Sequence, residues 1–255
     1  MFSEYDTLNG EIEHTMQSLE TGDCWLLAGV NSLNTTPWGR KIIKNALRPD
    51  GEGGAIVTLR GADNTQKEYR VTLAELDKAL LSDKYSVGDD DMLAIELAVE
   101  KYAKKQIEAG KLDKSPGEAI VGGIDRNMLY LLSGKPSHDF HAKDKNIDSA
   151  LDKIMANSTK YSSYCAFQND TEHLSNYHAY TIKEIKKDLS GNKFVVLINP
   201  QDSESPEIVP YEEFRNNLRL LVVLDNPANP DNTLKSEIDL IDEQIESLKK
   251  ENQDI

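Results

Sequence analysis

The spacing of hydrophobic residues predicts a first part of the chain rich in helices and a second part rich in strands. Helices are predicted where apolar residues recur every three to four positions, over 24–33, 42–47, 72–81, 90–109, 125–132, 147–156 and 211–217. Strands are predicted where apolar runs are short or alternate with polar residues, over 55–60, 68–73, 164–167, 178–185, 193–199 and 218–225. The change falls near Gly134, so we expect an α+β protein with a helical lobe over 1–134 and a β-rich lobe over 135–226.

Several predicted elements carry their own start and stop signals. Thr72 and Glu75 have the spacing of a capping box, which starts a helix. The acidic run 89–91 suits the positive N-terminal end of the next helix. Gly134 follows a helical pattern in the place of a C-cap, and residues 188–192 (DLSGN) read as a hairpin turn.

The last segment, 227–255, is expected to be a linker followed by an amphipathic helix. Residues 226–233 (NPANPDNT) have the composition of a linker. The apolar positions beyond them, which have heptad spacing, are Leu234, Ile238, Ile241, Ile245 and Leu248. About two heptads are too few for a stable coiled coil alone. We therefore expect this helix to dock on the core or on a partner, or to begin a segment of a longer protein.

Charge and hydropathy limit which classes of partner and which cellular compartment are expected. The 255 residues carry a formal net charge of −15, which disfavours binding to nucleic acid or anionic membranes because both are polyanions. No apolar run approaches the roughly 18 residues of a membrane span, and the N-terminal segment lacks the basic start and apolar block of a signal peptide. We expect a cytoplasmic protein, or one exported by a route without a visible signal peptide.

The chain has only two cysteines, Cys24 and Cys165, which are too few for a disulfide framework. No cysteine and histidine spacing typical of a zinc site is present. Cys24 follows Gly22-Asp23 and opens a predicted helix, and a helix N-terminus is one device that lowers a thiol pKa. The alternative is a small buried hydrophobic residue, which is a common place for a free cysteine. Cys165 lies in an alternating strand with no evident polar partner.

A reactive thiol also needs a base. The five histidines are His14, His138, His141, His173 and His178. His138 and His141 lie in a segment that reads as a polar loop, whereas His178 begins a good strand, which fixes a side chain better than a loop. Asn199 ends the following strand, across the predicted hairpin, where its side-chain oxygen could orient the imidazole.

These segments resemble the calpain-type, papain-like cysteine proteases. GDCWLLAGVNSL (22–33) is similar to the nucleophile segment of the family, YHAYTI (177–182) to its histidine strand and LINP (197–200) to its asparagine turn. ELAVEKYAKK (96–105) and YEEFRNNLRLLVV (211–223) resemble other parts of the protease core. The order of the three motifs is that of the family, and the resemblance covers roughly 12–225.

The resemblance implies a papain-like core of two lobes and a cysteine endopeptidase that acts on polypeptides through an acyl-enzyme. It implies Cys24 as the nucleophile, His178 as the base and Asn199 as the residue that orients it. It also implies a glutamine upstream of the cysteine as an oxyanion donor, for which Gln17 is the candidate. Gln17 departs from the pattern: it lies one residue farther from the cysteine than the family usually shows, and Ser18 follows it in place of glycine.

Other implied roles concern the substrate and the metal. Gly122 and Gly123 match a family site where a substrate backbone approaches, and Trp25 is expected to pack near the cleft. Gln201 replaces the tryptophan that usually shields the asparagine–histidine hydrogen bond. The chemistry requires no cofactor. Many family members need calcium, but the sequence has no EF-hand loop, so calcium dependence stays open.

Two other classes of function remain open from the sequence. A catalytically silent binding module could keep this fold, although all three triad residue types are present. The same nucleophile chemistry would also serve an acyltransferase or a deamidase. We take the endopeptidase as the leading interpretation.

Overall fold

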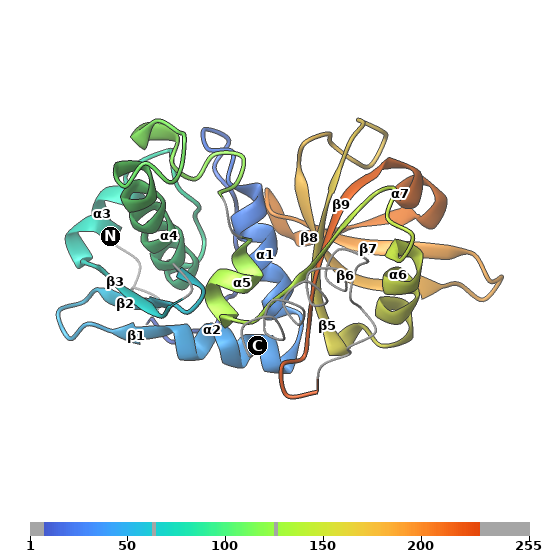
Figure 1. Ribbon diagram of the computed structural model, residues 1–255, viewed down its shortest axis with the longest axis horizontal. Coiled ribbons are helices and arrows are strands. Elements are labelled where there is room, and N and C mark those ends of the chain that lie inside the picture. The colour runs from blue at the N-terminus through green and yellow to red at the C-terminus, as the bar shows by residue number, and fades with distance from the viewer. Residues whose placement is uncertain (1–7, 63–64, 125–126, 230–255) are drawn as a thin grey trace, which may run out of the picture.

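The computed structural model describes residues 8–62, 65–124 and 127–229 (Figure 1). Its helices are α1 (Cys24–Asn34), α2 (Pro37–Ala46), α3 (Leu73–Leu80), α4 (Asp90–Glu108), α5 (Met128–Ser133), α6 (Ile147–Ala156) and α7 (Tyr211–Asn217), with 3-10 turns η2 (Pro116–Glu118) and η3 (Ser158–Lys160). Its strands are β1 (Leu47–Pro49), β2 (Ala55–Leu59), β3 (Lys67–Val71), β4 (His138–His141), β5 (Tyr161–Phe167), β6 (Ala179–Lys187), β7 (Lys193–Asn199), β8 (Asp202–Pro210) and β9 (Leu218–Asp225).

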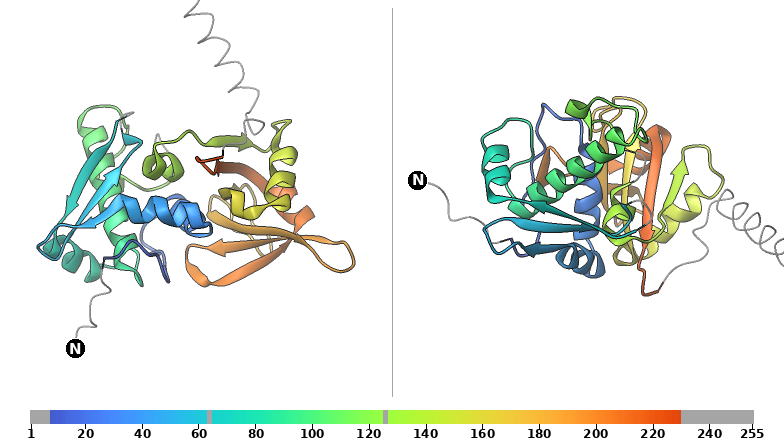
Figure 2. Two further views of the ribbon diagram at one scale, coloured as in Figure 1. Left: turned by 90° about the horizontal axis from the view of Figure 1, so that it is seen from below. Right: turned by 60° about the vertical axis from the view of Figure 1, so that its left-hand side comes forward.

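The strands form two antiparallel sheets, and with the helices they give an α+β protein. The small sheet has the order β1-β2-β3, and the large sheet has the order β4-β9-β5-β6-β7-β8. The small sheet lies with α3 and α4 on one side of the molecule, and the large sheet lies on the other (Figures 1 and 2). Helix α1 runs between the two parts, so a residue at its end is reached from both.

The large sheet separates two hydrophobic clusters. On β9, Val222 and Leu224 pack into the cluster with α1, α4 and α5, whereas Leu221 and Val223 pack into the cluster with α6 and α7. This is the two-residue alternation of a strand that is buried on both faces. One face of the large sheet therefore packs against the helical part of the chain. On this face, β6 is a strand that contacts α1.

Helix α1 is buried along almost its whole length because its sequence, CWLLAGVNSLN, is apolar on every side. Two hydroxyl contacts tie this region to the large sheet. Thr181 Oγ1 on β6 donates to the Ala28 carbonyl at 2.6 Å, and Thr36 and Ser162 lie 3.2 Å apart at their hydroxyl oxygens. The position of α1 relative to β6 is thus set by packing and by hydrogen bonds.

The local signals of the sequence are confirmed where the structure tests them. Thr72 and Glu75 form a reciprocal capping box at the start of α3, and the Asp89 side chain accepts from Met92 N at the start of α4. Gly134 ends α5 in the left-handed conformation with φ of 65°, which favours glycine. The turn at 188–192 joins β6 to β7, with the Asp188 and Asn192 backbones hydrogen-bonded at 2.9 Å.

Three strands were not predicted. His138 and His141, expected in a polar loop, lie on β4, which pairs with β9. Leu47, expected in a helix, begins β1. Strand β8 is mostly exposed at the edge of the large sheet and reads DSESPEIVP, so its sequence lacks the apolar alternation on which the prediction depended. Edge strands are recognised poorly from hydrophobic pattern because only one of their faces, or neither, enters a core.

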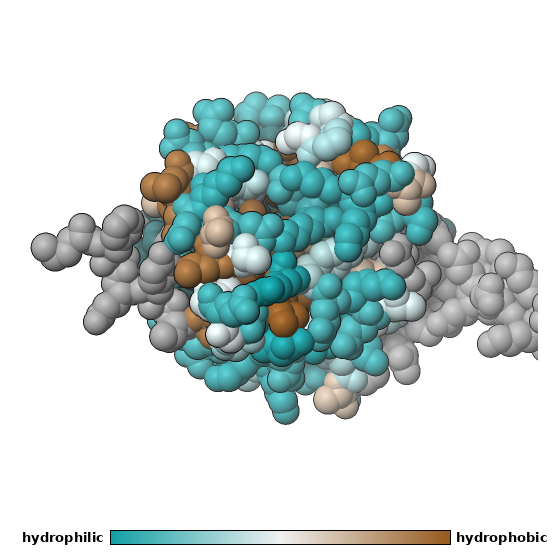
Figure 3. All heavy atoms as spheres, turned by 90° about the vertical axis from the view of Figure 1, so that its left-hand side faces the viewer, coloured by the Kyte–Doolittle hydropathy of each residue, from teal (hydrophilic) through white to brown (hydrophobic). Residues whose placement is uncertain are grey.

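The predicted heptad helix after the linker lies outside the described residues, which end at 229. The face of the molecule nearest α3 and the small sheet is mostly hydrophilic, with small separate hydrophobic patches (Figure 3). Among the described helices, none has the length and apolar content required to cross a bilayer.

Candidate active site

Cys24 is the first residue of α1, as predicted, and only 8% of it is exposed. The backbone N–H of Ala179, at the start of β6, interacts with its sulfur and favours the thiolate, as do the backbone N–H groups of Trp25 and of Cys24 itself. The thiol therefore lies where the N-terminal end of α1 meets the first residue of β6. His178 is the residue immediately before that contact.

The backbone turns sharply just before His178. Tyr177 has φ of 51°, the left-handed conformation that a non-glycine residue rarely adopts. Its exposed ring stacks on the Arg219 guanidinium at 5.0 Å. The His178 ring packs edge-on against the Tyr180 ring, with 4.9 Å between centroids. These contacts hold the imidazole at the start of β6 in one orientation.

His178 and Asn199 form the predicted pair. His178 Nε2 lies 2.9 Å from Asn199 Oδ1, which also accepts from Gln201 N at 3.1 Å. Asn199 Nδ2 donates to Glu207 Oε1 at 3.0 Å, which fixes the direction of the amide. Because the amide oxygen faces the ring, Nε2 must carry the proton. Nδ1 is left as the ring nitrogen that can accept a proton.

Glu207 is a site residue that the sequence analysis missed. It lies on β8, the unpredicted edge strand, and it orients the Asn199 amide. Its carboxylate also favours the charged form of His178 electrostatically. No sequence motif marks it, because the strand that carries it has no recognisable pattern.

Burial favours the neutral forms of both reacting groups. It raises the pKa of the Cys24 thiol above the usual 9.0, even though the helix N-terminus and the Ala179 N–H act in the opposite direction. Burial also lowers the pKa of His178 below 6.5, against the Asn199 hydrogen bond and the Glu207 charge. The helix end therefore lowers the thiol pKa by less than burial raises it. A neutral imidazole is the form that can take the thiol proton.

Gln17 lies in the loop that leads to Cys24 and is 6% exposed. Its Nε2 donates to the Thr21 carbonyl at 2.8 Å, and its amide also contacts the Asp23 carboxyl, whose pKa that contact lowers. Its backbone N–H donates to the Pro200 carbonyl at 2.8 Å, so the loop is held beside the Asn199 turn. Ser18, the neighbouring alternative donor, uses its hydroxyl on the Asp83 carbonyl.

Gly122 and Gly123 are brought next to the nucleophile segment. Gly122 N donates to the Gly22 carbonyl at 2.6 Å, and the Trp25 indole N–H donates to the Ile120 carbonyl at 2.8 Å. Both glycines have positive φ, 67° and 102°, and open space where a Cβ would lie. The backbone of this loop is thus open to an approaching chain. Lys114 Nζ braces it by donating to carbonyls on either side, those of Val121 and Gly123.

Other candidate residues lie elsewhere. His173 pairs with Glu213 on α7 at 3.0 Å, and His14 lies near Ser203 and Glu204. Cys165 is fully buried on β5, where its thiol faces the Tyr180 carbonyl at 3.6 Å. Gln201 is exposed and contributes its backbone N–H to Asn199. At this position the family usually has a tryptophan that shields the asparagine–histidine hydrogen bond, and here the side chain is polar.

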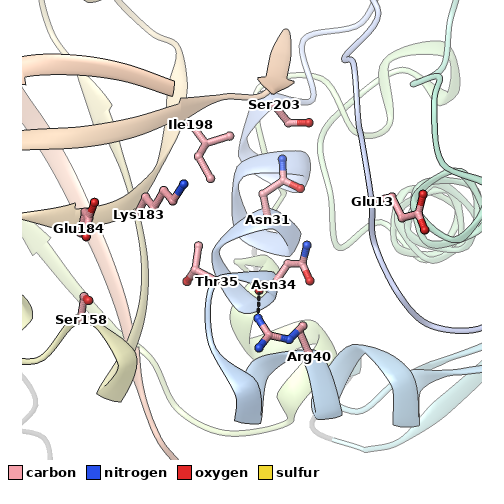
Figure 4. Close-up of a pocket in the computed structure, with 10 residues that line it drawn as sticks. All are labelled: Glu13, Asn31, Asn34, Thr35, Arg40, Ser158, Lys183, Glu184, Ile198 and Ser203. Atoms are coloured by element: carbon pink, nitrogen blue, oxygen red, sulfur yellow. Dashed lines mark hydrogen bonds between the residues drawn. The ribbon is translucent and has the colours of Figure 1, made fainter. Parts of the chain in front are cut away.

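Two hollows adjoin α1 at opposite ends. One of about 570 Å³ lies beside Gly22 and Val121, next to the glycine loop and the start of α1. The other, of about 420 Å³, lies toward the C-terminal half of α1, where Asn31 and Asn34 face Lys183 on β6 (Figure 4). The first borders the nucleophile segment, whereas none of the residues lining the second belongs to the Cys24–His178–Asn199 set.

A scan against models of known protein families finds no match, and a comparison with curated proteins also finds none. In the described part of the chain, no group of three or more His, Cys, Asp or Glu side chains is arranged to hold a metal ion.

If the chain has the peptidase activity that the resemblance implies, Asn199→Ala should lower turnover of a peptide by about 10²-fold, less than the loss of the thiol or of the imidazole. Asn199 fixes the tautomer and direction of His178 but exchanges no proton. Because Gln201 stands where the family has a shielding tryptophan, the His178–Asn199 hydrogen bond is more open to water, and its contribution to turnover is smaller. The measurement is kcat on a peptide substrate, with Asn192→Ala in the exposed 188–192 turn as the matched control. An Asn199→Ala enzyme as inactive as one without Cys24, with its fold intact, would contradict a purely orienting role.

We expect Gln17→Ala to lower kcat by about 10²- to 10³-fold, the usual effect of removing one oxyanion donor. Alkylation of Cys24 by iodoacetamide should stay nearly unchanged, because that reaction needs the thiolate and no oxyanion donor. Gln17→Glu should be at least as harmful, since its carboxylate repels the developing charge. Gln168→Ala, another glutamine that donates to a carbonyl but lies in an exposed position, is the control. Turnover within about twofold of wild type for Gln17→Ala would move the donor role elsewhere in 14–21, with Ser18 tested first.

Proposed function

We propose that this chain is a calpain-like cysteine endopeptidase with a papain-like core, in which Cys24, His178 and Asn199 form the catalytic triad. The observation that carries the proposal is the meeting of three elements: the Cys24 sulfur at the N–H of Ala179, the imidazole of the preceding residue, and Asn199 hydrogen-bonded to it at 2.9 Å. Cys24 comes from α1, His178 immediately precedes β6, and Asn199 is the last residue of β7. A nucleophile, a base and an orienting group are thus present in the order that acyl transfer needs.

In the proposed reaction, His178 Nδ1 takes the proton of the Cys24 thiol while Nε2 stays hydrogen-bonded to Asn199. The thiolate attacks the carbonyl carbon of a peptide bond and forms a tetrahedral intermediate. His178 then gives the proton to the leaving amine as the C–N bond breaks. The thioester that remains on Cys24 is hydrolysed by water, which His178 activates in turn.

The backbone N–H of Cys24 and the side-chain amide of Gln17 are the proposed donors to the oxyanion. Both belong to the segment that leads into α1. The proposed substrate chain lies along Gly122 and Gly123, whose backbone has no side chains over it. The hollow beside Gly22 and Val121 adjoins this loop and gives space for a substrate side chain.

The neutral state of both groups supports a base mechanism at neutral pH. Glu207, which steadies Asn199, also supplies a negative charge that stabilises the imidazolium once the proton has moved. A catalytically silent module would have no need to keep the His178 tautomer fixed through Asn199 and Glu207. The acyltransferase and deamidase alternatives share this chemistry, so they are separated by product and not by geometry.

The proposal is tested in two steps with the purified chain. A peptide carrying a thiol-reactive group should label Cys24, identified by mass spectrometry, and Cys24→Ala should remain unlabelled. A casein digest should then yield new fragments with free N-termini. Labelling without cleavage would exclude the endopeptidase, and labelled enzyme that changes only side-chain masses would indicate a deamidase or acyltransferase. The digest is run with added calcium and with a chelator, because calcium dependence is untested.

A further inference from the structure

Two buried carboxyl groups lie directly behind the proposed nucleophile. Asp23 precedes Cys24 and is 1% exposed, and Glu96 on α4 is fully buried. Asp23 occupies the N-cap position of α1, yet its side chain makes no capping hydrogen bond. The carboxyl faces Glu96, and neither residue has a role in the acyl-transfer mechanism.

The two carboxyl groups satisfy each other only if they share a proton. Taken as two carboxylates, both Asp23 oxygens and Glu96 Oε1 are buried and accept no hydrogen bond from the described residues. Two acceptors cannot pair, and two buried like charges repel. One proton between them removes both difficulties, because a protonated carboxyl donates to the other.

The surroundings assign the proton to Asp23. Glu96 Oε2 accepts from Ser86 N at 3.0 Å and from Ser86 Oγ at 2.6 Å, and these donors stabilise its negative charge. Burial, followed by the Glu96 charge, raises the pKa of Asp23 to about 9, against a smaller opposing contact from Gln17. Asp23 thus stays neutral through neutral pH and donates to Glu96.

Resting on the function proposed above, we propose that Asp23 and Glu96 are a positioning pair that holds one proton on Asp23 and the negative charge on Glu96, away from the Cys24 thiol. A charge on Asp23 would oppose formation of the adjacent thiolate, because like charges repel. The pair therefore lets a buried acidic residue stand beside the nucleophile without suppressing it. After burial, repulsion by the Asp23 charge is the other cause that raises the pKa of Cys24.

Other charged groups also face this cluster. Glu100, one turn along α4, repels the Glu96 charge, but it is itself paired with Lys84 at 2.5 Å and Lys104 at 3.0 Å. On the other side of the thiol, Tyr164 on β5 is a titratable neighbour, and His178 immediately precedes Ala179, whose backbone N–H contacts the sulfur. Substitution of Asp23 or Glu96 leaves all of these groups in place.

Two nearly isosteric variants separate charge position from packing. In Asp23→Asn, the amide donates to Glu96 and the charge stays on Glu96, as in the wild type. In Glu96→Gln, the charge that opposes ionisation of Asp23 is gone and the new amide donates to the Asp23 carboxyl, so a negative charge forms beside Cys24 at lower pH than in the wild type. Each variant keeps one carboxylate, one amide and the same shape. The readout is the rate of Cys24 alkylation by iodoacetamide against pH, in a Cys165→Ala background so that one thiol reacts.

We expect Glu96→Gln to shift the alkylation profile upward by about one pH unit, and so to slow alkylation near neutral pH about tenfold. Asp23→Asn should keep its profile within about 0.3 unit of the parent near neutral pH. The same ranking is expected for kcat/KM on a peptide. Alkylation does not need peptidase activity, so this test stands even if the endopeptidase proposal fails.

Equal shifts in the two variants, or no shift in Glu96→Gln, would overturn the proposal in favour of a packing role. Circular dichroism and thermal unfolding establish that each variant is folded. If Glu96→Gln does not fold, Ser86→Ala serves in its place. It removes the 2.6 Å hydroxyl donor to Glu96, moves the charge toward Asp23, and should shift the profile in the same direction by a smaller amount.

Discussion

Cys24→Ala is expected to eliminate peptide hydrolysis, with turnover falling by at least about 10⁴-fold, because the thiol is the only proposed group that bonds to substrate. The variant should fold, since the side chain loses one atom at a site that is already at the edge of the core. The measurement is kcat/KM on a fluorogenic peptide, with circular dichroism to establish that the fold is intact. The remaining acceleration, from the oxyanion donors and substrate binding, should be small.

Cys165→Ala is the matched control, because it removes the other thiol from a fully buried place on β5. It faces the Tyr180 carbonyl and the cluster under α6 and α7, on the far side of the sheet from α1. Peptidase activity near wild type is expected. Activity retained by Cys24→Ala, or lost in a folded Cys165→Ala, would show that Cys24 is not the reactive thiol.

Hydrophobic pattern predicted the elements that enter a core and failed where no core face is present. Helices α1 and α4 and the buried strands β5, β6, β7 and β9 all have long or alternating apolar runs, and each was expected at nearly its observed place. Strand β8 has a polar, exposed sequence at the sheet edge, and β4 has only Phe140 fully buried. Both are held mainly by backbone pairing to a neighbour, which local sequence does not encode.

The same limit applies to the site. The residue types and their order marked Cys24, His178 and Asn199, and a helix start and two strand ends gave their approximate places. Glu207 was missed because it lies on the unpredicted β8. The carboxyl pair was missed because Asp23 and Glu96 are far apart in sequence and meet only when α4 packs near α1. The direction of the thiol pKa shift could not be predicted from the sequence, because burial, which the sequence does not show, outweighs the helix end.

His178→Ala is expected to lower turnover by about 10⁴-fold or more, because His178 immediately precedes the Cys24–Ala179 contact and is the proposed acceptor of the thiol proton. His173→Ala should keep near wild-type activity, since that imidazole is paired with Glu213 on α7. Both are measured as kcat on the same peptide, with unfolding midpoints to detect a loss of fold. An essential His173 together with a dispensable His178 would contradict both the site and the resemblance on which it was first drawn.

The pH dependence gives a second readout of His178. In the wild type, the base must be neutral, and its pKa is lowered from 6.5 by burial, so activity should fall only as the pH drops below 6.5. Burial raises the pKa of the Cys24 thiol above 9.0 in the intact chain, and His178→Ala removes in addition the base that takes the thiol proton. The rate of Cys24 alkylation at pH 7 should then be limited by a thiolate fraction below about 1%. A His178→Ala profile that still rises near pH 6 would show that another group accepts the thiol proton, and His178 would lose its role as the base.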